Sequence, residues 1–169
     1  MRFAPHIKKG GVVLDVASGY GRHARVLGND GYSVVAVDVD TSGLEDLRDA
    51  PSFEIIAADL ESAPWPFEDR LFDGIIVTNY LHRPHFPLLI AGLSAGGVLI
   101  IETFGGGNER LGRPRNADFL LAPGELLEAF APYLHVVAYE HGEERTPRRA
   151  VRQRLCAVKG EGPYLLSGQ

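Results

Sequence analysis

Acidic side chains stand at or near the ends of three successive apolar segments of this chain, at Asp15, Asp38 and Asp59. The first is followed by a turn that contains Gly19 and Gly21, and a turn without Cβ atoms lets a ligand approach the backbone amides closely. Asp38 comes 17 residues after Gly21, near the spacing of about 20 at which a carboxylate accepts hydrogen bonds from the ribose of a nucleotide. These residues therefore predict a binding site for a ligand that contains a nucleoside.

Asp15 distinguishes between two such ligands. Residues 19–24 also fit the dinucleotide fingerprint Gly-x-Gly-x-x-Gly/Ala, but a pyrophosphate would repel a carboxylate placed beside it. The ammonium and sulfonium groups of S-adenosylmethionine would instead attract that carboxylate, so the sequence favours the methyl donor over NAD. A simpler interpretation stays open for each aspartate, since a cap on a turn or helix needs the same residue type.

With these residues the chain resembles the class I S-adenosylmethionine-dependent methyltransferases. Their first motif, Asp-x-Ala/Gly-x-Gly-x-Gly, stands here at residues 15–21. The resemblance covers roughly residues 12–104, and beyond them only the general plan is similar. Within that range the matching features are Asp38, Ala58-Asp59-Leu60, Pro64-Trp65-Pro66-Phe67 and the apolar segments 72–77 and 96–101.

The resemblance implies S-adenosylmethionine as the cofactor. It places Asp59 beside the adenine amino group and Leu60 against the same ring. The cofactor-binding residues that it implies are Asp15, Ala17, Gly19, Gly21, Asp38, Val39, Asp59, Leu60 and Asn79. Within the superfamily, the small size and the loops look most like the small-molecule branch that includes tellurite-resistance and thiol methyltransferases.

The elements that would position these residues alternate along the chain. Strands are predicted over residues 12–17, 33–38, 53–58, 74–78, 98–103 and 136–140, and helices over residues 22–29, 42–48, 86–93 and 123–130. This alternation predicts an α/β fold with a Rossmann-like, doubly wound, mostly parallel sheet. The last apolar run, residues 151–158, follows a polar segment too short for a crossover helix, so a terminal antiparallel hairpin strand is expected.

Length and composition restrict the class of protein. A chain of 169 residues that is 45% hydrophobic is expected to form a single domain over residues 1–169. Its net charge of −5 and single cysteine, Cys156, make nucleic acid an unexpected partner and exclude an internal disulfide and a cysteine metal cluster; no metal site is predicted. The chain contains no apolar run of membrane-spanning length and no signal-peptide pattern, so we expect a cytoplasmic protein without a membrane partner.

The segment after the fourth predicted strand holds the candidate catalytic residues. His82 and His85 are the best candidates for a general base, because a neutral imidazole can accept a proton near neutral pH, and Tyr80 is a further candidate. Each histidine could instead be a loop residue with its hydrogen bonds satisfied. Arg83 could hold an anionic substrate group or pair with a surface acid.

A long connection, residues 104–116, follows the fifth predicted strand and contains Gly105-Gly106-Gly107. We expect it to form a lid or binding loop without regular structure, with the glycines as a hinge. Arg110, Arg113 and Arg115 in this loop could recognise a carboxylate, phosphate or oxyanion, or they could simply be solvated. A second basic cluster, residues 145–154, is expected to form a solvated face of the hairpin.

The sequence thus predicts an enzyme that moves a methyl group from S-adenosylmethionine to a small-molecule nucleophile. Methylation of RNA or protein, and an inactive subunit that only binds the cofactor, are the alternatives. Residues 1–11 contain Pro5 and Gly10-Gly11, which oppose a long helix before the first strand. The cover of the site would then come from loops or from another chain, as in a homodimer.

Overall fold

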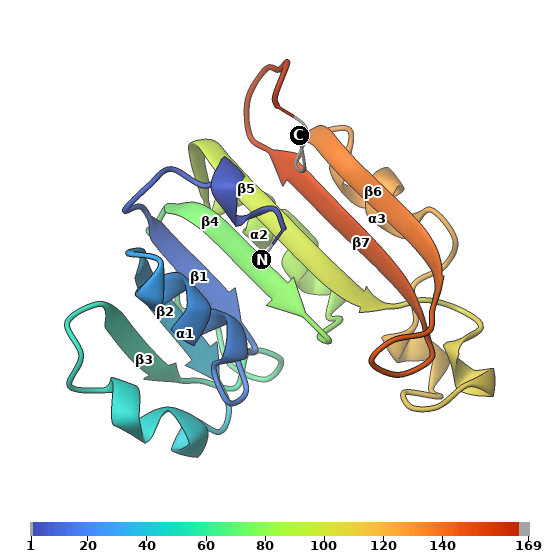
Figure 1. Ribbon diagram of the computed structural model, residues 1–169, viewed down its shortest axis with the longest axis horizontal. Coiled ribbons are helices and arrows are strands. Elements are labelled where there is room, and N and C mark those ends of the chain that lie inside the picture. The colour runs from blue at the N-terminus through green and yellow to red at the C-terminus, as the bar shows by residue number, and fades with distance from the viewer. Residues whose placement is uncertain (1, 166–169) are drawn as a thin grey trace.

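The computed structural model describes residues 2–165, and its strands form one seven-stranded sheet in the order β3-β2-β1-β4-β5-β7-β6 (Figure 1). The strands are β1 (Val12–Val16), β2 (Ser33–Asp38), β3 (Phe53–Ala57), β4 (Phe72–Thr78), β5 (Leu93–Phe104), β6 (His135–Glu144) and β7 (Ala150–Val158). The helices are α1 (Arg22–Asn29), α2 (Phe86–Ala91) and α3 (Glu125–Phe130). The 3₁₀ turns are η1 (Ala4–His6), η2 (Ser42–Leu47), η3 (Arg83–His85), η4 (Asn108–Arg110) and η5 (Ala117–Phe119).

Strand pairing confirms the predicted fold class. Strands β1 to β5 pair in parallel, whereas β7 pairs antiparallel with both β5 and β6. The chain moves outward from β1 to β3 and then returns to β4 on the other side of β1. In open α/β sheets a ligand binds at the carboxyl ends of the strands where the order reverses, which here is between β1 and β4.

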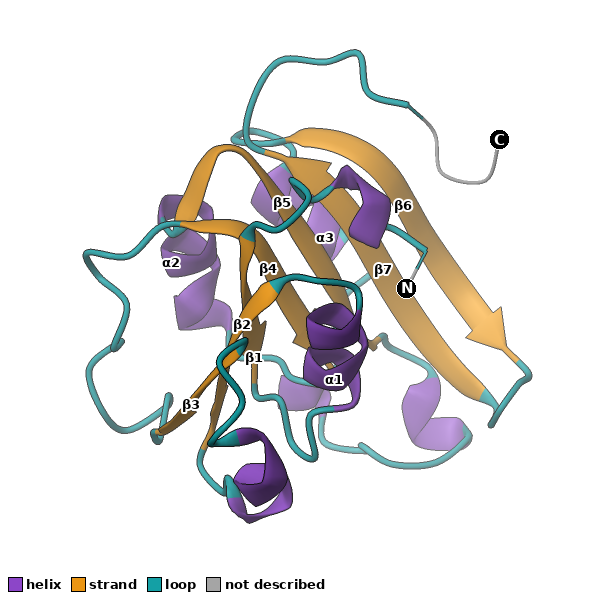
Figure 2. Cartoon of the chain, turned by 60° about the vertical axis from the view of Figure 1, so that its left-hand side comes forward, coloured by secondary structure: helices purple, strands orange, loops and turns teal. Residues whose placement is uncertain are grey.

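The two faces of the sheet are covered unequally. Helices α2 and α3 lie on one face, over a buried cluster that includes Leu99 and Phe130; α1 lies on the other face, near β1 and β2 (Figures 1 and 2). Part of the remaining α1 face is covered by the N-terminal segment, in which Phe3 and Ile7 are buried. Ile7 lies so close to β4 that a Cβ on Gly74 would come within 2.7 Å of its Cδ1 atom. A short strap therefore occupies part of the face that α1 leaves open.

Three predicted elements differ from the structure. Residues 42–47 form a 3₁₀ turn instead of an α-helix, because a segment this short, with Gly43 inside it, gains little from helix propagation. The predicted helix 86–93 ends at Ala91, since the carbonyl of Gly92 accepts a hydrogen bond from the amide of Phe72 and β5 begins at the next residue.

The third difference concerns the long connection after β5, for which a structureless lid with a glycine hinge was the wrong expectation. Its two ends are bonded together, because the Gly106 amide donates to the Leu121 carbonyl and the Leu121 amide donates to Phe104. The side chain of Asn108 is buried and bonds both the Val151 amide and the Pro114 carbonyl. The loop is therefore fixed to β7 through backbone and amide hydrogen bonds.

None of the helices within residues 2–165 is long and apolar enough to cross a membrane.

Lys159, just after β7, caps the end of α2. Its Nζ atom lies 3.1 Å from the Ile90 carbonyl, 3.3 Å from that of Ala91 and 2.7 Å from that of Leu93. Replacing it in Lys159→Met should lower the free energy of unfolding by about 1–3 kcal/mol, because carbonyls at a helix end lose a charged donor. Urea denaturation measures this change. The exposed Lys9 supplies the control, and equal stability of Lys159→Met and Lys9→Met would contradict the capping role.

Candidate active site

Two residues with a left-handed backbone mark the carboxyl ends of β1 and β4. Ala17 has a φ of 51° and Asn79 a φ of 56°, and they are the non-glycine residues with positive φ among those described. Such a conformation costs energy for a residue with a Cβ, and observed cases gather at functional sites. Because Val16 pairs with Val77, the two strained residues lie at neighbouring strand ends, where the order of the sheet reverses.

A cavity of about 410 Å³ opens at this edge. Eight residues at or just after the ends of β1 to β4 line it, and five of them were expected to bind the cofactor. The lining residues are Ala17, Asp38, Val39, Ala58, Asp59, Leu60, Glu61 and Tyr80. The structure thus brings together residues from four separate strands, as the resemblance implied.

The glycine turn is held by Asp38. The Gly19 amide donates to Asp38 Oδ2 at 2.7 Å, and Asp38 Oδ1 accepts from the Asp40 amide at 3.1 Å. A Cβ on Gly19 would meet no atom within 4 Å, so this glycine faces open space in which a ligand can approach. The Ser18 hydroxyl beside it is buried and lacks a hydrogen-bond partner among the described residues.

Gly21 has a packing role that the sequence did not reveal. It is buried, its φ is +68°, and a Cβ there would lie 2.4 Å from Leu44 Cδ2. Contact between Gly21 and the cofactor stays a prediction. Gly21 is required because the start of α1 packs directly against η2.

Asp15 caps α1 from inside the sheet. Its Oδ2 atom accepts a hydrogen bond from the Ala24 amide at 3.0 Å, and only 1% of the residue is exposed. Burial raises the pKa of the carboxyl to about 7, and the charge of Asp38 adds to the increase. Asp15 therefore caps the first turn of α1, which is the simpler interpretation that the sequence left open. A direct contact between Asp15 and a cofactor stays a prediction, as does an electrostatic attraction through its ionised form.

The residues after β3 and β4 form the opposite wall of this cavity. Asp59 Oδ1 accepts hydrogen bonds from the amides of Glu61 and Ser62 at 3.0 and 3.1 Å, so Asp59 caps this turn, as one interpretation of the sequence allowed. Its carboxylate is also exposed beside the cavity. Burial, followed by the charge of Glu61, raises the pKa of the Tyr80 phenol. Tyr80 therefore remains a neutral phenol and is poorly suited to accept a proton.

The structure gives His85 a packing role. It is 5% exposed, its Nε2 atom donates to the Leu60 carbonyl at 2.9 Å, and its ring lies 4.9 Å from that of Trp65 and 4.4 Å from that of His82. Burial lowers its pKa, so a neutral ring with Nε2 protonated accounts for its contacts. These contacts favour the alternative of a packed loop histidine, although its buried Nδ1 atom has no hydrogen-bond partner among the described residues, and a role of His85 as a base stays a prediction. The catalytic role of His82 stays a prediction.

The four arginines expected at the substrate do not converge. Arg83 pairs with Glu125 and also donates to the carbonyls of Asp118 and Leu120, so it pairs with an acid and holds the loop before α3. Arg110 is 85% exposed beside Glu109.

Arg113 lies apart from these two, in a cavity of about 450 Å³ between the loop and the tip of the β6–β7 hairpin. Arg148, Arg149 and Arg152 line the same cavity, whereas Arg115 lies at an exposed position that is absent from this lining.

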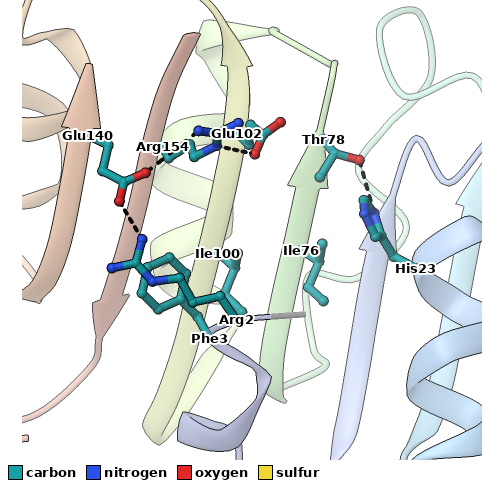
Figure 3. A pocket seen from close by; sticks show the side chains of 9 residues that line it. All are labelled: Arg2, Phe3, His23, Ile76, Thr78, Ile100, Glu102, Glu140 and Arg154. Atoms are coloured by element: carbon teal, nitrogen blue, oxygen red, sulfur yellow. Dashed lines mark hydrogen bonds and ion pairs between the residues drawn. The ribbon is translucent and has the colours of Figure 1, made fainter. Parts of the chain in front are cut away.

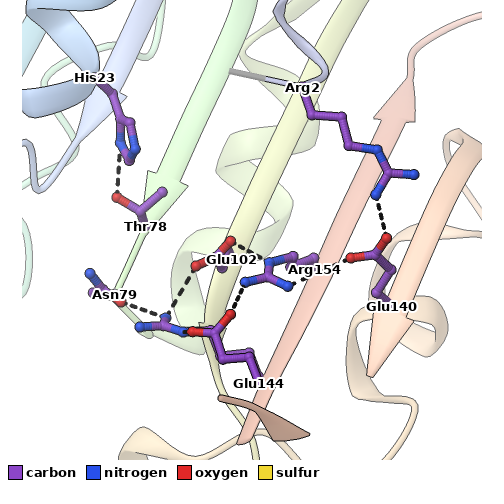
Figure 4. A network of polar contacts seen from close by, with 9 residues as sticks. Arg2, His23, Thr78, Asn79, Glu102, Glu140, Glu144 and Arg154 are labelled. Carbon is purple, nitrogen blue, oxygen red and sulfur yellow. Dashed lines mark hydrogen bonds and ion pairs between the residues drawn. The ribbon is translucent and has the colours of Figure 1, made fainter. Parts of the chain in front are cut away.

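Sequence reasoning missed the charges that the hairpin brings to the site. Arg152 Nη1 donates to Asn79 Oδ1 at 2.7 Å and lies 3.3 Å from Glu102. Arg154 bonds Glu102 at 2.5 Å and also Glu144, so the network joins β5, β6 and β7 (Figure 4). The alternation of arginines along the predicted last strand was the available signal, and it was interpreted as a solvated face.

Similarity to known proteins agrees with this geometry. A family model described as a methyltransferase domain matches residues 13–94. The fold is similar to that of TehB from Haemophilus influenzae, with a TM-score of 0.75 and 19% identity over 92% of this chain. The match spans 60% of the length of that protein. No curated protein sequence matches the chain significantly.

Two further structures share the fold. One is an S-adenosylmethionine-dependent methyltransferase from Methanosarcina mazei, at a TM-score of 0.70 and 16% identity over 93% of this chain and 96% of that one. The other is the 1,6-didemethyltoxoflavin-N1-methyltransferase of Burkholderia thailandensis with bound S-adenosylhomocysteine. Its TM-score is 0.69, with 20% identity over 94% of this chain and 75% of that one.

The fold is a Rossmann-like α/β fold with a cavity at the switch point of its sheet. Residues 13–94 match a methyltransferase domain, and solved S-adenosylmethionine-dependent methyltransferases share the fold of the chain, so S-adenosylmethionine is the cofactor that these findings support. The residues present fit that group. Asp38 stands where ribose hydroxyls need an acceptor, and the buried Ser18 hydroxyl has a free bonding capacity beside the open face of Gly19.

Alanine substitutions separate the roles of the two glycines. Gly21→Ala should lower the free energy of unfolding by about 2–4 kcal/mol, because the new Cβ overlaps Leu44. Gly19→Ala should cost only about 1–2 kcal/mol through backbone strain but weaken S-adenosylhomocysteine binding at least about tenfold, or about 1.4 kcal/mol. Thermal unfolding and calorimetric titration measure the two effects. Equal binding by Gly19→Ala and the wild type would contradict the assignment.

The raised pKa of Asp15 makes stability depend on pH. Because the folded carboxyl holds its proton up to about pH 7 and the unfolded one loses it near pH 4, its contribution is present at low pH and is lost as pH rises through 7. Between pH 6 and 8 the free energy of unfolding should fall by about 1.4 kcal/mol more in the wild type than in Asp15→Asn. Urea denaturation at several pH values tests this; parallel curves would contradict it.

Proposed function

We propose that this enzyme transfers the methyl group of S-adenosylmethionine to a small molecule. The observation that carries the proposal is the neutralisation of the cations near the cofactor site. Arg83 is paired with Glu125, and Arg152 and Arg154 are paired with Glu102 and Glu144. A polynucleotide would need a row of free cations along an extended surface.

The cavity at the hairpin tip suits a ligand of limited size. Arg113 and Arg148 are two of the arginines within residues 2–165 that form no ion pair with a carboxylate, and both line this cavity of about 450 Å³. Cavities of this volume suit small molecules. The methyltransferase of B. thailandensis, a structural neighbour, holds 1,6-didemethyltoxoflavin, a small molecule, which adds support from a protein with this fold.

The protein contributes alignment and exclusion of water. S-adenosylmethionine supplies an electrophilic methyl group on a sulfonium, and the residues of this chain would hold the acceptor in line with the bond that breaks. Such orientation can contribute about 7–11 kcal/mol to lowering the barrier. Asn79 is well placed for this task, because its strained backbone and its bond to Arg152 fix the end of β4.

The alternatives of the sequence analysis remain outcomes of the test: RNA or protein methylation, and an inactive subunit. The cytoplasmic location and the homodimer that completes the site also stay predictions.

Label transfer tests the proposed function. The protein is incubated with S-adenosylmethionine carrying a tritiated methyl group and a cell lysate, which is then separated into metabolites, RNA and protein. The label should enter the metabolite fraction with the wild type and not with Asp38→Ala, which loses the ribose acceptor. Label in RNA or protein would contradict the small-molecule assignment. Label in no fraction, together with binding of S-adenosylhomocysteine, would indicate an inactive cofactor-binding subunit.

A further inference from the structure

A second cavity, of about 310 Å³, lies on the α1 face of the sheet (Figure 3). Its lining residues are Arg2, Phe3, His23, Ile76, Thr78, Ile100, Glu102, Glu140 and Arg154. Ile76 and Ile100 form its floor, with His23 on one side and the N-terminal strap, Arg2 and Phe3, on the other (Figure 3). The cavity occupies the part of the face that neither α1 nor a further helix covers.

This cavity adjoins the cofactor site. Thr78 is the last residue of β4 and lines it, whereas Ala17 directly follows β1 and lines the first cavity. The pairing of Val16 with Val77 makes Ala17 and Thr78 neighbours across the switch point. A molecule held over Ile76 and Ile100 would therefore lie beside the ligand of the glycine turn.

His23 lines the second cavity next to Thr78. It belongs to the first turn of α1, two residues after Gly21, and its Nδ1 atom lies 3.2 Å from Thr78 Oγ1. No hydrogen bond joins its Nε2 atom to another of residues 2–165. With Nδ1 protonated and donating to the Thr78 hydroxyl, Nε2 carries a lone pair available to a molecule in the second cavity.

The surrounding charges keep this imidazole neutral. Burial lowers the pKa of His23, and the neighbouring Arg22 lowers it further, whereas Glu102 on β5 raises it. The other charged groups of the lining are paired, Arg154 with Glu102 and Glu140, and Arg2 with Glu140. Hence His23 is available as a base at neutral pH.

We propose that the second cavity is the acceptor site and that His23 Nε2 accepts the proton that the acceptor loses on methylation. This inference rests on the proposed function. The acceptor's N–H or O–H bond breaks toward Nε2, its lone pair forms a bond to the methyl carbon, and the carbon–sulfur bond breaks with its electrons retained by sulfur. The methylated acceptor and S-adenosylhomocysteine leave, and His23 releases the proton to water.

The lining defines the class of acceptor. Two cationic and two anionic side chains surround the cavity, so their formal charges cancel and favour an uncharged molecule. Ile76 and Ile100 offer an apolar surface for a flat ring, and at its edge the Phe3 ring lies under the Arg2 guanidinium, with 4.7 Å between the guanidinium carbon and the ring centroid. The acceptor class is therefore a small uncharged phenol or heteroaromatic N–H compound, for which a base contributes about 10²–10⁴-fold to the rate.

Binding of probe compounds tests the site. The protein loaded with S-adenosylhomocysteine is titrated with phenol, indole and benzimidazole while the methyl groups of its isoleucines and leucines are followed by NMR, since Leu111 reports on the arginine-lined cavity. At least one probe should shift Ile76 and Ile100, and Ile100→Phe should abolish that binding. Ile90→Phe, at a half-buried position on the opposite face, is the matched control. Shifts confined to residues around the arginine-lined cavity, or no shift with any probe, would overturn the acceptor site.

Turnover of a bound probe tests His23. His23→Asn keeps a donor for Thr78 but lacks the basic nitrogen, so kcat should fall about 100-fold or more, whereas affinity for S-adenosylhomocysteine should change less than twofold. The decline of wild-type kcat at low pH, as His23 gains a proton, should disappear in the variant. An unchanged kcat or pH profile would overturn the role of His23, and so would a loss of cofactor affinity. If the wild type fails to bind S-adenosylhomocysteine, the proposed function fails first.

Discussion

The buried hydrogen bond from the Ala24 amide to Asp15 Oδ2 fixes the start of α1 against the end of β1, and the position of the glycine turn follows from it. It joins Asp15, next to last in β1, to the first turn of α1, and the chain between them forms a tight turn with positive φ at Ala17, Gly19 and Gly21. The same bond sets the rotation of α1. His23 consequently faces Thr78 at the end of β4, while Gly19 faces the open side of the turn.

The Asp15 carboxyl thus both caps α1 and can carry a charge next to the cofactor cavity. Asp15 is almost fully buried with Asp38 nearby, and its pKa of about 7 means that near neutral pH it exists in both protonation states. A cation in the neighbouring cavity would favour the ionised form. The attraction to a sulfonium inferred from the sequence would then operate through a change of protonation on binding, and not through a charge that is present beforehand.

Ion pairs on β5, β6 and β7 occupy a part of the sheet that no helix covers. Glu102, Glu144, Arg152 and Arg154 lie on three adjacent strands and satisfy one another while still half-buried. Partly buried ion pairs of this kind contribute little net stability, but they fix geometry. Here they hold the hairpin against Asn79 (Figure 4) and leave a cavity beside it that an apolar face would have closed by packing.

The sequence predicted the doubly wound, mostly parallel sheet, the antiparallel hairpin and five of the eight residues that line the first cavity, because buried parallel strands are continuous apolar segments and the glycine motif is local. It missed His23 and Arg152, whose roles depend on contacts 55 and 73 residues away along the chain. It also missed the packing of Gly21 against Leu44, which belongs to a turn whose position no local pattern reveals.

The most direct test of this account is a calorimetric titration of the wild type, Asp38→Ala and Asp40→Ala with S-adenosylhomocysteine and with NAD. Asp38 lines the first cavity and holds the glycine turn, whereas Asp40 caps only the next turn, at Ser42. The account predicts one S-adenosylhomocysteine per chain with the wild type and Asp40→Ala, strongly weakened binding with Asp38→Ala, and no binding of NAD. Binding of NAD by the wild type, or equal S-adenosylhomocysteine affinity in all three proteins, would contradict it.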